Sequence, residues 1–424
     1  MTDFPCDPDT SAATLANGVR VVAIRLPHLA SACVSVFVRT GSRHESLPLN
    51  GISHFIEHMA FKGTHERDCQ RINLDAERLG AEVNAHTDKD HTAYHMRGMA
   101  RDAGRLVQML GDIVRNSIFP DAELERERQV ILHEYTEDED DPLSAAYKLF
   151  DKACFGMHPI ARPVIGTRAN IERITRADLL AYVQRQYTGA NVVVGVAGNI
   201  DPELVINDAQ AAFGSLRRGS EHVVAAPTYI GGIKTLRQAG CSQTHVVLGF
   251  PTPTLKDDYH ASIVAAALFG EGMSSPLMDQ IRERRGLVYY AACSADVMDL
   301  YGQFVIEAST APEHLDELFG EVMKLLVAHA GTIDHVGLER ARNQIKVRNL
   351  GAQERPFRRL EDAAQDLFVH GRIRSGAELT ARVEAVTADQ VRDAFGRMLA
   401  ARASVAIAGK VPKGARHRLH ELVA

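Results

Sequence analysis

The amino-acid sequence predicts an α+β fold built from two homologous halves of the same topology. Three observations predict it: the chain length, a repeated order of elements, and a segment between the copies where periodicity lapses. The chain has 424 residues, of which 45% are hydrophobic and 24% are charged. That length is too great for one ordinary core and suits two domains of about 200 residues each.

The repeat is clearest near the end of each half. Residues 171–175 (IERIT) lead through a helical pattern to an expected strand at 192–197, which stops at Gly198. Residues 383–387 (VEAVT) lead through a similar helix to an expected strand at 404–408, which stops at Gly409. The threonine and the glycine lie 23 residues apart in the first copy and 22 in the second. Repetition on this scale indicates a duplicated structural unit.

Elements upstream follow the same order in both copies. The β-rich run at 32–38 corresponds to the run at 245–250, and the helical pattern at 101–118 corresponds to that at 314–330. Basic residues, glycine and proline gather at 216–234, where the periodicity lapses, so the boundary is placed there. We therefore predict an N-terminal domain at residues 1–220, a linker at 221–234, and a C-terminal domain at 235–424.

Composition excludes several classes of partner. The net charge of −6 shows no basic footprint for nucleic acid. No apolar run approaches the roughly 20 residues of a membrane span. The first residues, MTDFP, lack the basic and apolar regions of a secretory signal. The cysteines are far apart and form no Cys-x-x-Cys pair, which indicates reduced thiols. We expect a soluble, cytoplasmic protein. The cysteines are Cys6, Cys33, Cys69, Cys154, Cys241 and Cys293.

A short helix in the N-terminal half carries a candidate metal motif. Residues 51–61 have helical periodicity, with Asn50 as a candidate cap and Gly63 as the stop. At about 100° per residue, the apolar side chains share one face of this helix. His54, Glu57 and His58 fall on the opposite face. The apolar face consists of Ile52, Phe55, Ile56, Met59 and Ala60.

This spacing suits a catalytic zinc ion. Histidines at positions i and i+4 lie ~5–6 Å apart, so His54 and His58 can bind one ion. Zinc lowers the pKa of bound water towards ~7, and Glu57 lies where its carboxylate can take a proton from that water. The equivalent segment of the second half, residues 261–270 (ASIVAAALFG), offers neither histidine nor glutamate. The sequence therefore predicts one zinc site per chain.

A carboxylate is expected as the third zinc ligand, with one position left for water. The helical pattern at 123–140 is rich in glutamate. Glu127 and Glu134 lie two turns apart and share one stripe, and spacing alone leaves both open as the ligand.

Other histidines crowd the same region of the chain. Each is interpreted as a surface or core residue and not as a ligand, because none has a partner four residues on with a glutamate between. His91 and His95 are four residues apart, but the residues between them alternate as in a strand. These histidines are His44, His65, His86, His91 and His95.

Residues 51–64, GISHFIEHMAFKGT, resemble the pitrilysin, insulysin and mitochondrial-processing-peptidase family of inverted-motif (HxxEH) zinc peptidases, in its short two-domain form. The resemblance covers nearly the whole chain and implies that each half is a mostly antiparallel sheet covered by helices. In that family the third ligand lies on a helix that reads Val-Ile-x-x-Glu. Residues 130–134 (VILHE) fit, 76 residues beyond His58. Glu134 is thus the implied ligand, and Glu127 the carboxylate that supports the ligands.

The resemblance also implies substrate-binding residues. Residues 84–94 resemble the family's edge strand, whose backbone pairs with an extended substrate, which implies that Asn84 and Ala85 fix the scissile region. Residues 282–289 (RERRGLVY) resemble the segment with the substrate-anchoring arginine and tyrosine, here Arg282 and Tyr289. One departure is Pro276, where family members often have an arginine, and any contact made by that arginine is lost.

Together these features predict a zinc-dependent endopeptidase that cleaves peptides or unfolded polypeptides in an enclosed chamber, with zinc-bound water activated by Glu57. A chain with two domains is expected to form a homodimer, with Arg282 and Tyr289 supplied by the partner. The alternatives are the active subunit of a heterodimer with a motif-less paralogue that matures a precursor peptide, a non-catalytic scaffold subunit, and a metal-storage protein. The intact motif argues against the scaffold, because inactive relatives usually lose one of its residues.

Overall fold

The computed structural model describes residues 7–423, which divide into two compact units. Unit 1 takes in the chain up to residue 136 together with residues 162–224 and 351–375. Unit 2 takes in residues 137–161 and 225–350 and the chain from residue 376 onward. The segment MTDFP and Cys6, both used in the sequence analysis, lie outside the described residues.

Unit 1 contains a six-stranded sheet in the order β1-β2-β6-β3-β5-β4. Strands β2 and β6 are parallel, and the other neighbours are antiparallel. Strand β4 therefore lies at one edge. The strands are β1 (Thr10–Thr14), β2 (Arg20–Arg25), β3 (Ser31–Val38), β4 (Glu82–Thr87), β5 (Thr92–Met99) and β6 (Val192–Gly198).

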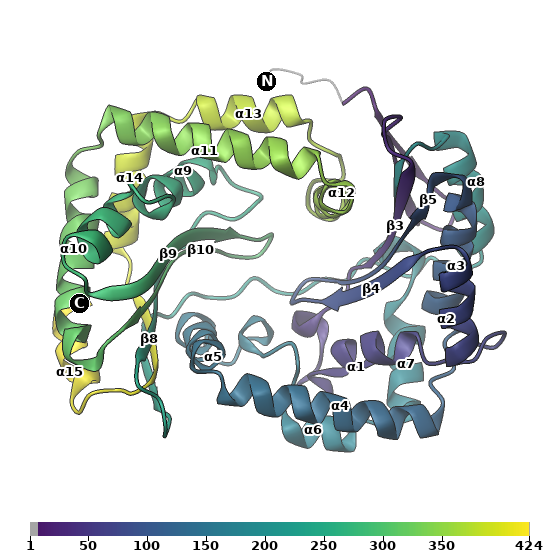
Figure 1. Ribbon diagram of the computed structural model, residues 1–424, viewed down its shortest axis with the longest axis horizontal. Helices are drawn as coiled ribbons and strands as arrows, with labels where there is room; N and C mark the ends of the chain where they lie inside the picture. The colour runs from purple at the N-terminus through teal and green to yellow at the C-terminus, as the bar shows by residue number, and fades with distance from the viewer. Residues whose placement is uncertain (1–6, 424) are drawn as a thin grey trace. The chain divides into compact units, whose positions relative to one another are not determined.

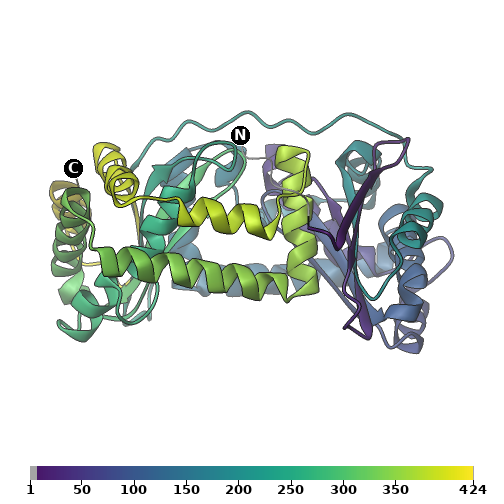
Figure 2. The same cartoon turned by 90° about the horizontal axis from the view of Figure 1, so that it is seen from above.

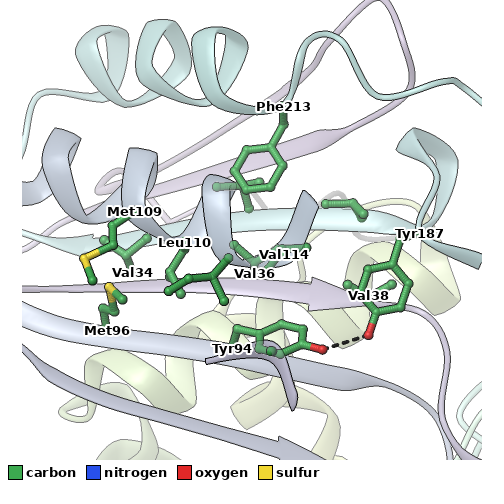
Figure 3. Close-up of a cluster of buried hydrophobic side chains, with 14 of the residues drawn as sticks. Val34, Val36, Val38, Tyr94, Met96, Met109, Leu110, Val114, Tyr187 and Phe213 are labelled. Carbon is green, nitrogen blue, oxygen red and sulfur yellow. Dashed lines mark hydrogen bonds between the residues drawn. The ribbon is translucent and has the colours of Figure 1, made fainter. Parts of the chain in front are cut away.

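One face of this sheet carries the main core of unit 1. Because successive side chains of a strand point to opposite faces, Val34, Val36 and Val38 of β3 all enter this core. Figure 3 shows them beside Tyr94 and Tyr187, whose hydroxyls are 2.8 Å apart and hydrogen-bond each other. The helices of this unit are α1 (Ile52–Ala60), α2 (Cys69–Arg78), α3 (Ala103–Asn116), α6 (Arg168–Arg173), α7 (Arg176–Gln186), α8 (Pro202–Phe213), α12 (Pro356–His370) and most of α4 (Asp121–Asp140).

The opposite face is covered by α12, as Figure 1 shows beside β3. Leu360, Ala363 and Leu367 of this helix pack with Phe37 and Val193 of the sheet. Helix α12 thus closes a second, smaller core, and the central strands β3 and β6 are buried on both faces.

Unit 2 repeats this arrangement with a five-stranded sheet in the order β7-β11-β8-β10-β9. Its one parallel pair, β7 and β11, corresponds to β2 and β6. This equivalence confirms the prediction of two homologous, mostly antiparallel halves covered by helices. The strands are β7 (Gly232–Arg237), β8 (Thr244–Thr252), β9 (Val288–Val297), β10 (Gly302–Thr310) and β11 (Ser404–Gly409). The helices are α5 (Pro142–Phe155), α9 (His260–Gly270), α10 (Leu315–Gly331), α13 (Gly376–Glu384), α14 (Ala388–Ala400), α15 (Ala415–Val423), most of α11 (His335–Gln353) and a π-helical turn, η6 (Leu277–Glu283).

Each half of the chain contributes one helix to the unit that the other half mainly forms. Helix α5 comes from the first half of the chain, yet it packs on β7, β8 and β11 of unit 2. Helix α12 comes from the second half and packs on the sheet of unit 1. The compact units therefore differ from the contiguous ranges 1–220 and 235–424, which remain a prediction about the repeat.

Between the halves, residues 217–231 contain neither helix nor strand, and Figure 2 shows them as a long teal trace. Strand β7 begins at Gly232, inside the range predicted as a linker. Within residues 7–423, no helix combines the length and the apolar character that a membrane span needs. None of the described cysteines forms a disulfide.

Candidate metal centre

Helix α1 begins at a tight turn that only glycine suits. Gly51 has φ 101°, and a Cβ there would lie 2.7 Å from the carbonyl oxygen of Ile165. The buried carboxylate of Glu45 accepts the backbone N–H groups of Gly51 at 2.7 Å and Ser53 at 2.8 Å. It also accepts a hydrogen bond from the side chain of Asn50 at 3.0 Å. The expectation that Asn50 caps the helix is therefore wrong, because Glu45 satisfies the first N–H groups instead.

The body of α1 packs by one face, as its periodicity predicts. Phe55, Ile56 and Met59 are buried in the core of unit 1, and the helix contacts β4, β5 and α7. His54 and His58 each keep 16% of their side-chain surface exposed. The packing of the apolar face thus directs the polar face of the helix out of the core.

Helix α4 brings the third ligand candidate to these histidines. An oxygen of Glu134, Oε2, lies 3.3 Å from Nε2 of His58 and 3.7 Å from Nε2 of His54. One donor atom of each residue lies within 4.8 Å of the other two. Donors that bind one zinc ion at ~2.0–2.2 Å lie ~3–4 Å apart, so these atoms fit a shared ion.

Glu127 supports this group from a place two helical turns before Glu134 on α4. Its Oε2 lies 3.2 Å from Nδ1 of His58, and its Oε1 lies 2.6 Å from Nζ of Lys62. A ring that donates Nδ1–H to a carboxylate presents the lone pair of Nε2 to a metal. Lys62 was not identified from the sequence as part of this centre. Its position four residues after His58 is a pattern that could have indicated it.

Burial sets the charge of the centre. Desolvation, with a smaller contribution from the charge of His58, lowers the pKa of His54 to about 3, which leaves the imidazole in its neutral, ligand form. Desolvation also raises the pKa of Glu57, opposed by a hydrogen bond from Thr87 and by His58. Thr87 ends β4 and was also missed by sequence reasoning, because its approach to α1 depends on the fold.

The remaining predicted residues lie in both units. Asn84 and Ala85 are on edge strand β4, which contacts α1, and the side chain of Ala85 packs against the core on that face. Arg282 lies in η6 of unit 2, where Nη1 approaches Sδ of Met273 at 3.6 Å. Tyr289, on edge strand β9 of unit 2, is 81% exposed. Unit 1 therefore brings together the three ligand candidates with Glu57, Glu127 and β4, while Arg282 and Tyr289 belong to unit 2.

Comparison with known proteins gives the family. Residues 20–168 match the insulinase family (peptidase family M16), and residues 173–345 match the M16 inactive domain. An uncharacterized zinc protease from Rickettsia felis is 30% identical over 398 residues, which cover 93% of this chain and 96% of that protein. One from Mycobacterium tuberculosis is 32% identical over 436 residues, which cover 98% of this chain and 97% of that protein.

Solved structures share the fold. A protease from Helicobacter pylori superposes with a TM-score of 0.86 at 21% identity and covers 95% of this chain and 99% of that chain. A chain of complex III2 from Candida albicans gives the same TM-score at 17% identity and covers 97% of this chain and 99% of that chain. The sequence matches carry the assignment, and the chain belongs to the insulinase family, peptidase family M16.

Proposed function

We propose that this chain is a zinc-dependent endopeptidase that hydrolyses peptides or unfolded polypeptides. The observation that carries the proposal is the convergence of His54, His58 and Glu134 on one point, with Glu57 beside them on α1. Two imidazoles and one carboxylate are the donor set of a catalytic zinc site with an open position. Membership of the insulinase family and relatives named zinc proteases support it.

Each residue of the centre would have a distinct role in peptide hydrolysis. A zinc ion held by the three ligands supplies a Lewis acid and makes water a better nucleophile at neutral pH. Glu57 acts as the general base, taking the proton of the attacking water and giving it to the leaving amine. The hydrogen bond from Thr87 orients its carboxylate. Glu127, held by Lys62, keeps the ring of His58 in the ligand orientation.

Edge strand β4 is the proposed substrate-binding element. A strand at a sheet edge has backbone groups that can pair with an extended peptide, and Asn84 and Ala85 would hold the scissile region there. The contact of β4 with α1, and the hydrogen bond that joins Thr87 to Glu57, would set a peptide on β4 alongside the general base.

We further propose a two-fold homodimer enclosing a chamber, in which Arg282 and Tyr289 of the partner chain act on the substrate. Arginine would polarise the scissile carbonyl, and tyrosine would stabilise the developing oxyanion. The high exposure of Tyr289 leaves its hydroxyl available to such a partner. The absence of disulfides among the described cysteines fits the cytoplasmic location that we propose.

Two alternatives to the homodimeric peptidase differ from it in what they require for activity. A heterodimer with a motif-less paralogue would process one precursor peptide and require that second chain for activity. A scaffold subunit would be inactive alone and in any pair. The complete ligand set and the presence of Glu57 favour the peptidase over the scaffold.

Hydrolysis itself is tested with a peptide mixture read by mass spectrometry. We expect cleavage that a chelator abolishes and added zinc restores. The His54→Ala/His58→Ala variant should lose activity and one zinc per chain, because it lacks two of three ligands. Glu137→Gln, an exposed glutamate on α4, is the matched control and should keep both. Cleavage that persists in His54→Ala/His58→Ala contradicts the proposal.

The dimer is tested by complementation. Glu57→Gln and Arg282→Ala homodimers should each be nearly inactive, because every site lacks one member. After random subunit exchange, half of the dimers are hybrids with one intact site each, so activity should recover to about a quarter of wild type. No recovery, with exchange shown independently, would mean that Arg282 does not act in trans.

A further inference from the structure

A second group of histidines lies on the opposite face of the unit 1 sheet. Strands β4 and β5 pair so that His86 faces Ala93 and Asn84 faces His95. The ring of His86 lies 5.0 Å from that of His95 and 5.4 Å from that of His91. Alternation along β5 turns Tyr94 towards the core that contains α1, and turns Ala93 and His95 towards α12.

Two carboxylates complete this group. Donor atoms of His86, Asp88 and His91 lie within 4.8 Å of one another. Oδ2 of Asp88 is 3.1 Å from Nδ1 of His91, and Oε1 of Glu361, on α12, is 3.6 Å from Nε2 of His86. These two distances join separate pairs, and Glu361 lies beside His86 outside the group of three. Donors that share one ion at ~2.0–2.2 Å lie ~3–4 Å apart, which both pair distances fit.

A chain of hydrogen bonds fixes the orientation of His86. Nδ1 of His86 lies 3.1 Å from Nε2 of His95, whose Nδ1 lies 2.8 Å from Oγ of Ser35. When His95 donates its Nδ1–H to Ser35, its Nε2 accepts the Nδ1–H of His86. Nε2 of His86 then presents a lone pair towards Glu361. Such outer contacts are the usual support of a metal-binding histidine, and Glu127 gives the same support to His58.

The carboxylates are also held with one oxygen turned towards the histidines. Arg358 donates to Oε2 of Glu361 at 2.9 Å, which leaves Oε1 for His86. The backbone N–H groups of Asp90 and His91 donate to Oδ1 of Asp88 at 2.6 and 2.7 Å, which leaves Oδ2 for His91. Each acidic residue therefore has one oxygen anchored by the protein and one available as a donor.

The cluster is not a complete hydrogen-bond network. Nε2 of His91 is buried and has no hydrogen-bond partner within the part of the chain that the structure describes. Nδ1 is the ring nitrogen that faces Asp88, so Nε2 is the atom of His91 that the described contacts leave unsatisfied, and a buried polar atom without a partner lowers stability.

We propose that His86, Asp88 and His91 form a second metal site, with Glu361 as the fourth ligand, for a divalent transition ion such as Zn²⁺. Imidazole suits zinc, cobalt and nickel more than magnesium or calcium, which prefer oxygen alone. The ion joins the β4–β5 hairpin to α12. Because α12 comes from the second half of the chain, binding at this site stabilises the exchanged packing of unit 1.

The test compares four full-length proteins after equilibration with zinc and desalting. Wild type should hold about two zinc ions, and His54→Ala/His58→Ala should hold about one. His86→Ala/His91→Ala should also hold about one, and the variant with all four substitutions should hold none. Zinc should raise the melting temperature of His54→Ala/His58→Ala and leave that of the fourfold variant unchanged. This design separates the second site from the catalytic one, because each site is counted without the other.

Controls address folding and specificity. His417→Ala/His420→Ala removes two exposed histidines of α15 and should leave zinc content unchanged. Glu361→Gln should weaken zinc binding in the His54→Ala/His58→Ala background by at least ~10-fold. His86 is 41% exposed on an edge strand, so His86→Ala alone should fold, as circular dichroism will show, and should lose the second ion. A His54→Ala/His58→Ala protein without zinc, or one whose zinc survives His86→Ala, overturns the proposal.

Discussion

Helix α1 of unit 1 and helix α9 of unit 2 occupy equivalent places beside equivalent sheets. When the two helices are aligned on their buried residues, Ser53 corresponds to Ser262 and Phe55 corresponds to Val264. All four side chains are buried. The polar face of α1 has no such counterpart. In α9 the equivalents of His54, Glu57 and His58 are Ile263, Ala266 and Ala267.

The partner helices α4 and α11 differ in the same way. In unit 1, Arg128 donates to the backbone oxygen of Ile174 at 2.8 Å, and in unit 2 Arg342 donates to that of Val386. This structural contact survives in both copies. Glu127 and Glu134, by contrast, align with Ala341 and Arg348. The comparison teaches that packing residues specify the repeated fold, while a few outward polar residues specify the chemistry of one copy.

The largest expected effect that tests the comparison of α1 with α9 is on the free energy of unfolding. Phe55 of α1 and Phe269 of α9 are both fully buried, so Phe55→Ala and Phe269→Ala should each lower the free energy of unfolding by about 3–5 kcal/mol. Only Phe55→Ala should also weaken zinc binding by the catalytic centre, because it loosens the helix that holds His54 and His58. Chemical denaturation and zinc titration measure the two effects. Equal loss of zinc affinity in both variants would show that the site depends on global stability alone.

A smaller effect is expected from the support of His58. Glu127→Gln should weaken zinc binding ~10–100-fold, because the amide no longer accepts strongly from both His58 and Lys62. Its equivalent in unit 2 is already an alanine, Ala341, so that copy shows that the fold does not need the carboxylate. Glu137→Gln is the matched control on the same helix. Unchanged affinity in Glu127→Gln would remove Glu127 from the centre.

The smallest effect concerns the start of α1. Burial raises the pKa of Glu45, despite four hydrogen bonds, from Asn50, Gly51 and Ser53, that oppose the shift. The folded state therefore binds this proton more tightly than the unfolded chain, and Glu45 lowers stability as the pH rises from about 4.5 through its higher folded pKa. Relative to Glu45→Gln, which cannot titrate, wild type should lose free energy of unfolding across that interval. Parallel stability curves from acid to neutral pH would contradict this account.

The sequence predicted the repeat because local signals recur in both halves. Thr175 with Asp178 and Thr387 with Gln390 form capping boxes at equivalent helix starts, and strands β6 and β11 follow each. The exchange of α5 and α12 was not predictable in this way. An apolar helix face shows that a helix is covered, but not which sheet covers it.

Most of the candidate metal centre could be predicted from the sequence, because His54, Glu57 and His58 lie within one and a half turns of one helix. Glu134 depended on the resemblance, because Glu127 shares its stripe. The second histidine cluster was not readable. Its members come from both strands of a hairpin, the turn between them and a helix 270 residues later, and only the strand register and the packing of α12 bring His86 and Glu361 together.

The central claim is that Glu57 is the base and Glu134 a ligand, in one copy of a repeated fold. The most direct test measures zinc content and kcat for Glu57→Gln and Glu134→Gln beside wild type. Glu57→Gln should keep all of the wild-type zinc while kcat falls at least ~10³-fold, because only proton transfer is lost. Glu134→Gln should lose one zinc ion per chain together with its activity. Loss of zinc in Glu57→Gln, with zinc retained in Glu134→Gln, would contradict the assignment.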